Sequence, residues 1–233
     1  MDTVIPPPET RSQLKDEAAA HIRGLIASGQ VQSGELMRLA PLAERVGASV
    51  TPVREALILL AQDGWVVQEP NRGFRVAPIT RRDVSDDYWV HAQVAGELAA
   101  RLARMIDEET LALLRRLDQQ IRNYETDDSN DDDSGALEEL NLGFHHVLNT
   151  AADSPRLLWY SEAASRFVLR RFWGTIPDWP EHNRYGHAGI VEALAAGDAA
   201  RSRAEIIAHV DRARDLVLTH LDTIGFWSAR DLP

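Results

Sequence analysis

Asparagine and histidine side chains are the clearest candidates for metal chemistry in this sequence. The chain contains eight histidines and no cysteine, so a metal site must draw its ligands from His, Asp, Glu or Asn. Asn141 and His145 are four residues apart in a predicted helix and therefore project from one face, about one turn apart. His187 and His209 fall in two further predicted helices. If these residues converge, three imidazoles and one amide oxygen would suit a divalent ion, with Zn²⁺ expected and Ni²⁺ or Mn²⁺ as alternatives.

A second group of polar residues lies on a predicted helix that begins near Ser49 or Thr51 and ends near Asp63. Apolar residues recur along it with the spacing of a buried helical stripe, at Val53, Ala56, Leu57 and Leu60. Thr51 and Arg54 therefore share the outer face. A hydroxyl at a helix start can bind a phosphate, and an arginine can bind a phosphate or a guanine. The candidate DNA contacts are Arg38, Ser49, Thr51, Arg54, Arg72 and Gly73.

The elements around this helix predict a winged helix-turn-helix. Helices are expected over residues 14–28 and 41–46, with Gly47 as the turn before the third helix. Two short strands, 65–68 and 73–76, flank a predicted turn over 69–72. We therefore expect a flexible arm over residues 1–10 and, over 11–78, a DNA-binding domain of three helices and a two-stranded wing.

Only helical patterns follow residue 78. Helices are predicted over residues 82–105, 110–124, 135–151, 155–173, 181–196 and 198–221, and the acidic segment DDSNDDDSG (127–135) is predicted to be a solvated loop. The fold is therefore expected to be mainly α, with an all-α helical bundle over residues 79–233 that binds an effector and forms a dimer.

The charge is unevenly distributed along the chain. The net charge is −11, but residues 1–80 hold 8 basic and 9 acidic residues, a net charge of −1, whereas residues 81–233 hold 17 and 27, a net charge of −10. The near-neutral N-terminal part is thus compatible with DNA binding. No apolar run approaches the roughly 20 residues of a membrane span, and the first ten residues lack the pattern of a secretory signal. We expect a cytoplasmic protein with no membrane partner.

Motifs between residues 22 and 76 occur in a characteristic order. They are the Gly34 turn, Leu42-Ala43-Glu44, Gly47, Ser49, Thr51-Pro52-Val53-Arg54-Glu55-Ala56-Leu57, Leu60, Asp63-Gly64-Trp65 and Arg72-Gly73. This segment resembles the N-terminal domain of the GntR family of bacterial regulators. Val50 stands where that family usually has an arginine that contacts DNA, and Ala48 replaces a customary valine. The resemblance implies operator binding with an unusual sequence preference.

The remaining chain resembles the FCD-type effector domain of the FadR-like branch of that family. The motifs are Asn141 through Phe144-His145, His187 through Ile190 with Gly197-Asp198, and His209. The resemblance implies a metal site at Asn141, His145, His187 and His209, although the first position is commonly an aspartate. It also implies an effector pocket, remodelled around His91 because an Arg and a Glu common in the family are replaced here by His91 and Ala95. Arg101, Arg166 and Arg170 are candidates for binding an effector carboxylate.

These observations predict a homodimeric, DNA-binding transcription regulator, by default a repressor, that responds to a small organic or sugar acid. One alternative keeps the DNA-binding role but has a metal-free C-terminal domain, because a lone histidine on a helix is more often a surface or hydrogen-bonded residue than a ligand. A metal-dependent hydrolase is the remote alternative. The sequence has no H-E-x-x-H motif or comparable carboxylate base, so we predict that the chain is not an enzyme.

Overall fold

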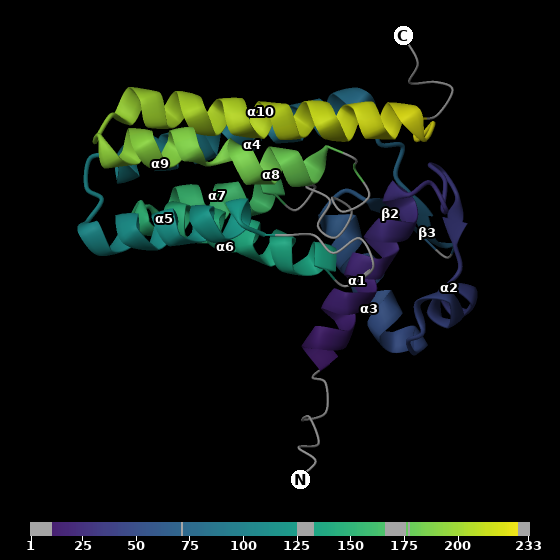
Figure 1. The fold of residues 1–233 in the computed structure, drawn as a ribbon. Helices are drawn as coiled ribbons and strands as arrows, with labels where there is room; N and C mark the ends of the chain where they lie inside the picture. The colour runs from purple at the N-terminus through teal and green to yellow at the C-terminus, as the bar shows by residue number, and fades with distance from the viewer. Residues whose placement is uncertain (1–10, 71, 125–132, 166–175, 177, 228–233) are drawn as a thin grey trace. The chain divides into compact units, whose positions relative to one another are not determined.

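The structure is a computed structural model that describes residues 11–70, 72–124, 133–165, 176 and 178–227 (Figure 1). The predicted arm over residues 1–10 lies outside the described residues. The described residues form two compact units, one of residues 11–79 with 224–227 and the other of residues 80–223. Among the described residues, no helix is long and apolar enough to cross a bilayer.

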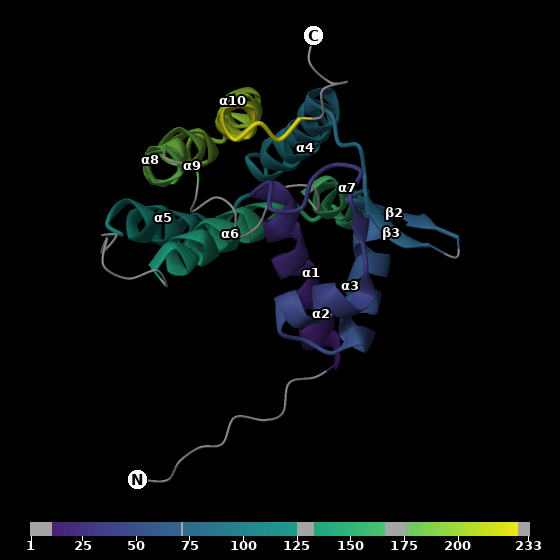
Figure 2. The same ribbon diagram turned by 90° about the vertical axis from the view of Figure 1, so that its right-hand side faces the viewer.

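The first unit is a winged helix-turn-helix. Its elements are α1 (Arg11–Ala27), β1 (Leu36–Met37), α2 (Leu39–Val46), α3 (Val50–Gln62), β2 (Val66–Glu69) and β3 (Gly73–Val76). Fully buried side chains from α1, α3 and the start of the wing form its core: Ile22, Ile26, Val53, Leu57, Leu60 and Trp65. The predicted helical stripe of α3 is therefore its buried face. Figure 2 shows the hairpin of β2 and β3 projecting beside the three helices.

Two local features fix the turn and the wing. Gly47 ends α2 with a φ of 72°, and its N–H bonds to the carbonyls of Ala43 and Glu44, which places α3 directly after the turn. The sheet has the order β1-β3-β2, all antiparallel, so it contains one strand more than the predicted hairpin. The additional strand consists of Leu36 and Met37, which pair with Arg75 and Phe74 of β3.

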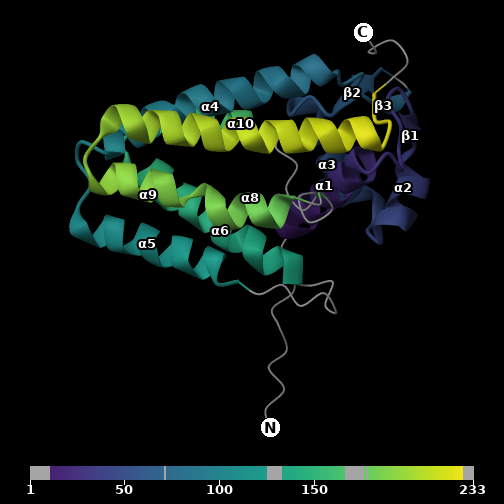
Figure 3. The same ribbon diagram turned by 45° about the horizontal axis from the view of Figure 1, so that its top comes forward.

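The second unit is a bundle of helices. They are α4 (Arg81–Leu102), α5 (Glu108–Arg122), α6 (Asp133–Ala151), α7 (Pro155–Ser165), α8 (Trp179–Gly186), α9 (Ala188–Ala195) and α10 (Ala199–Thr223). The long α10 packs along α4 on one side and along α9 on the other (Figures 1 and 3), and α5 packs against α6. Thr80 and Asp83 form a reciprocal capping box at the start of α4.

Two predicted helices of this unit need correction. The helix expected over 181–196 is two helices, α8 and α9, with the break at His187. α6 begins at Asp133, inside the segment predicted to be a loop, and the remainder of that loop lies outside the described residues. The helix predicted over 155–173 is observed as far as Ser165, and residues 166–173 also lie outside the described part.

Candidate DNA-reading surface and metal centre

The outer face of α3 is open to solvent. Val50, Thr51, Arg54 and Ile58 are all exposed there, opposite the buried stripe. Ser49 is the N-cap, with φ −77° and ψ 162°, and its exposed hydroxyl makes no capping hydrogen bond. The helix thus starts at the earlier of the two predicted positions. Its N-terminal end presents a hydroxyl pair and a guanidinium, which are the groups that contact phosphates and base edges.

The other predicted DNA contacts lie at the ends of α2 and of the wing. Arg38 is exposed at the N-cap of α2, and Arg72 is exposed at the tip of the β2–β3 hairpin. Gly73 has a φ of 101°, a conformation that favours glycine. Its role is therefore to allow the tight turn that leads into β3. Arg75 is engaged within the wing, because it forms an ion pair with Glu69 (Nε to Oε1, 2.6 Å) and donates to the carbonyl of Gly34. The guanidinium of Arg72 is therefore the one placed at the hairpin tip.

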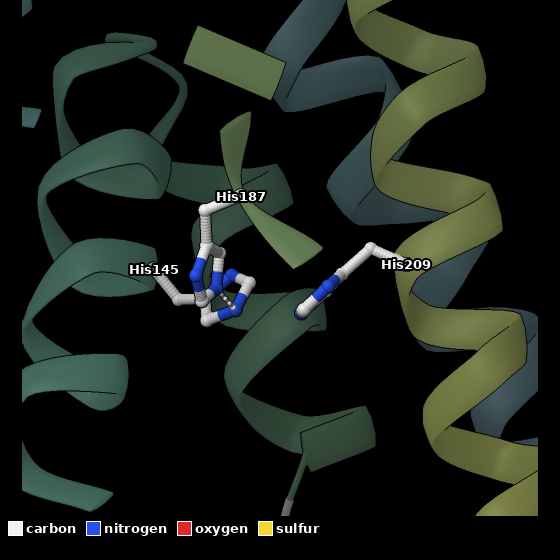
Figure 4. A group of neighbouring side chains, drawn as sticks. All are labelled: His145, His187 and His209. Carbon is white, nitrogen blue, oxygen red and sulfur yellow. Dashed lines mark hydrogen bonds between the residues drawn. The ribbon is translucent and has the colours of Figure 1, made fainter. Parts of the chain in front are cut away.

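Three histidines from distant parts of the chain meet inside the second unit. His145 comes from α6, His187 from the break between α8 and α9, and His209 from α10 (Figure 4). One ring nitrogen from each lies within 4.8 Å of the others. The Nε2 atoms of His145 and His187 are 3.4 Å apart. The structure thus brings together all three histidines that the sequence marked as metal ligands.

The spacing of the His145 and His187 nitrogens fits a shared cation. Two nitrogens bound at 2.0–2.1 Å to a tetrahedral Zn²⁺ would be about 3.3 Å apart. The observed 3.4 Å is close to that value and exceeds the usual length of a hydrogen bond between two ring nitrogens. Asn141, the fourth predicted ligand, is buried, and its Oδ1 has no hydrogen-bond partner in the part of the chain that the structure describes. A buried oxygen of this kind is costly unless it has a partner such as an ion.

The protonation of the rings also favours metal binding. Burial, together with smaller contributions from neighbouring His91 and His182, lowers the pKa of His145 to about 3. Burial likewise lowers the pKa of His187 and of His209 well below the usual value, with additional contributions from the other rings. All three imidazoles are therefore neutral at pH 7, which is the form that binds a metal ion.

The helix break at His187 depends on its neighbours. A methyl group added at Gly186 would lie 2.5 Å from Nδ1 of His209, so only glycine lets α10 bring that ring close to the break. His182, also on α8, stacks on His209, with ring centroids 4.4 Å apart and an angle of 19° between the planes. The ring of His209 is thus held between α8 and its own helix.

A cavity of about 400 Å³ opens beside the histidines. His91 of α4 lines it, as expected, and burial lowers the pKa of this histidine to about 4. Asn149, which sequence reasoning missed, also lines the cavity. It continues the stripe of Asn141 and His145 at the same spacing of four residues, so the signal was present in the sequence. Further lining residues without a distinctive sequence signal are Tyr88, Ser161, Glu162 and Trp179.

None of the arginines predicted to bind an effector carboxylate lines this cavity within the described residues. Arg101 is not a lining residue. It is exposed, forms an ion pair with Glu97 (2.9 Å) and donates to the hydroxyl of Ser154 (3.0 Å). The prediction of Arg101 as an effector ligand is therefore corrected: Glu97, one helical turn earlier, binds it at the surface. Arg166 and Arg170 lie outside the described residues.

A winged helix-turn-helix followed by a helical domain defines a class, the two-domain transcription regulators that carry a DNA-binding domain and a second, helical domain. Residues 14–76 match the bacterial regulatory proteins of the gntR family, and residues 86–222 match the FCD domain. The chain therefore belongs to the GntR family and carries an FCD domain. It is a DNA-binding transcription regulator and not an enzyme.

Individual proteins support this assignment. An HTH-type transcriptional regulator of Mycobacterium tuberculosis is 27% identical over 196 residues, which are 81% of this chain and 78% of the relative. The HTH-type transcriptional repressor RspR of Escherichia coli is 33% identical over 128 residues, 51% of this chain and 52% of that protein. The solved structure of E. coli McbR/YncC has the same fold, with a TM-score of 0.63 at 19% identity, and covers 89% of this chain and 98% of that chain.

Proposed function

We propose that this regulator is a homodimeric repressor whose affinity for operator DNA is controlled by a small carboxylate effector, bound beside a divalent metal ion in the FCD domain. The observation that carries the proposal is the cluster of three neutral imidazoles, two of them buried and one half-buried, with an amide oxygen that has no hydrogen-bond partner among the described residues, beside a cavity of about 400 Å³. This volume is in the usual range for a small-molecule site.

The metal would be held by His145, His187, His209 and Asn141. Zn²⁺ is the expected ion because imidazole nitrogens and one oxygen form a ligand set that it accepts. When bound, it would supply the positive charge that attracts a carboxylate to an otherwise neutral set of donors. His91, Asn149 and Ser161 line the same cavity and provide hydrogen-bonding groups that would orient the remainder of an organic or sugar acid.

Operator binding is assigned to α3 and the wing. Arg54 lies on the open face of α3, with Ser49 and Thr51 at its N-terminal end, and Arg38 and Arg72 are exposed at the start of α2 and at the hairpin tip. One winged helix makes few contacts, so two copies on a two-fold operator are expected. Repression is proposed because the relative RspR is named a repressor.

Metal analysis of the purified protein tests the sensor site. We expect about one divalent ion per chain, lost when His145, His187 and His209 are replaced by alanine and retained in His21→Ala, whose histidine is exposed on α1. No metal after incubation with Zn²⁺ or Ni²⁺ would refute the site and leave the metal-free alternative. Thermal-shift measurements with small carboxylates, with and without Zn²⁺, then test whether the effector requires the ion.

DNA binding is tested separately. The operator is selected from random duplexes by the wild-type protein, and dissociation constants are measured by fluorescence anisotropy. We expect Arg54→Ala to weaken binding by about 1–3 kcal/mol for each half-site, because it removes a charge-assisted contact to a base or phosphate. If a folded Arg54→Ala protein binds the operator with unchanged affinity, α3 is not the helix that contacts the bases.

A further inference from the structure

The open face of α3 carries two branched aliphatic side chains as well as its polar groups. Val50 is 41% exposed and Ile58 is 43% exposed. Within the described part of residues 11–79, the only other large apolar side chain with comparable exposure is Val67 on β2. β-branched residues are weak helix formers, so an exposed valine or isoleucine adds little to the stability of α3. On a face that also carries Thr51 and Arg54, these side chains are available to contact a partner outside the chain.

We propose that Val50 contacts the C5-methyl group of a thymine in the major groove and makes the regulator select thymine at that position of each half-site. This inference rests on the proposed role of α3 in reading DNA. It adds a specificity determinant to the polar contacts, and it identifies the base that this determinant recognises.

The position of Val50 in the helix supports this contact. Val50 is the first residue of α3, directly after the Ser49 N-cap. In helix-turn-helix proteins the N-terminal residues of the recognition helix contact the base edges. Arg54 lies four residues later, which places it about 6 Å further along the helix axis and about 40° around it. A valine and an arginine on this one face would thus meet base pairs close to each other in the same groove.

The chemistry of the major groove determines which base fits. Of the four bases, only thymine presents a methyl group there, whereas the other bases present hydrogen-bond donors and acceptors. The side chain of Val50 can neither donate nor accept a hydrogen bond. A polar base edge placed against it would lose water without gaining a partner, which is unfavourable. A thymine methyl would instead be removed from water, which is worth about 0.8 kcal/mol for one such group, or about fourfold in affinity.

The test uses the selected operator and replaces its thymines one at a time by deoxyuridine, which lacks only the methyl group. For the wild-type protein, we expect one thymine in each half-site whose replacement raises the dissociation constant about fourfold. In Val50→Ala the same replacement should have little effect, because the side chain that meets the methyl group has been removed. This coupling between the two changes is the quantity measured by a double-mutant cycle.

Val90→Ala is the matched control. Val90 is 42% exposed, almost the same as Val50, but it lies on α4 of the other unit, so sensitivity to deoxyuridine should remain as in the wild type. Circular dichroism verifies that both variants fold. If every deoxyuridine costs Val50→Ala as much as it costs the wild type, the thymine contact is refuted even when Arg54→Ala abolishes binding. If Arg54→Ala also binds normally, the proposed role of α3 itself fails.

Discussion

Gly186→Ala perturbs the proposed metal centre without replacing any of its ligands. A methyl group at this position would lie 2.5 Å from Nδ1 and 2.9 Å from Cε1 of His209. Heavy atoms in contact are normally about 3.5–4.0 Å apart, so the ring has to retreat by about 1 Å. It has little room to do so, because His209 is 4% exposed and His182 stacks against it.

Two effects of this displacement can be given magnitudes. In the metal-free protein, overpacking of this kind typically costs about 1–3 kcal/mol of stability. In the metal-bound protein, a ligand moved by about 1 Å exceeds the tolerance of about 0.2 Å in a metal–nitrogen distance. We therefore expect the affinity for Zn²⁺ to fall on the order of 10- to 100-fold, as when residues that orient metal ligands are replaced.

Competition with a chelating dye measures the affinity, and urea unfolding of the metal-free protein measures the stability. Gly24→Ala is the control: it lies inside α1, and nothing lies within 4 Å of the added methyl group. This variant should bind Zn²⁺ normally and gain up to about 1 kcal/mol from the better helix propensity of alanine. Wild-type Zn²⁺ affinity in Gly186→Ala would show that His209 is not a ligand, and the proposed site would have to be abandoned.

Two further predictions concern salt and pH. Arg72→Ala should weaken binding equally to all DNA duplexes. It should also reduce the slope of log affinity against log salt concentration by about 0.9 for each phosphate that the arginine neutralises. An unchanged slope would contradict a phosphate contact at the tip of the hairpin. Burial lowers the pKa of His91 and His182 to about 4 and that of His145 to about 3. The unfolded chain therefore binds more protons below about pH 6.5, and the metal-free protein should lose stability as the pH falls from there toward 4. Equal urea midpoints at pH 7 and pH 5 would disprove this.

The elements that carry their own periodicity could be predicted from the sequence. The buried stripe of α3 follows from the spacing of Val53, Ala56, Leu57 and Leu60, and all four are buried. Gly47 could be placed because a left-handed residue commonly ends a helix. By contrast, β1 is too short to show an alternating pattern. It exists as a strand because β3 offers it hydrogen-bond partners, which is a tertiary effect.

The proposed metal centre likewise contains features that the sequence predicts and features that it does not. The chemistry of His145, His187 and His209 could be predicted from their residue types, but the helix break that positions His187 could not. The apolar pattern continues from α8 into α9, so the local sequence favours one helix over 181–196. The separation at His187 accompanies a close approach between residues far apart in sequence, Gly186 and His209. Arg101 is a different case. Its ion-pair partner Glu97 lies four residues earlier in the same helix, so this surface pair could have been predicted from the sequence.

α4 is the element of the helical unit that follows the DNA-binding unit directly in the sequence, and it also lines the cavity. The residues after β3 belong firmly to the first unit: the N–H of Ala77 bonds to the carbonyl of Trp65 at 3.0 Å, and Ile79 is buried. Thr80 then caps α4, whose second and third turns contribute Tyr88 and His91 to the cavity. α4 therefore begins directly after the last residue of the first unit and lines the cavity within its first three turns. If an effector in this cavity and operator DNA favour different conformations of the protein, linkage requires each of them to lower the affinity for the other by the same factor.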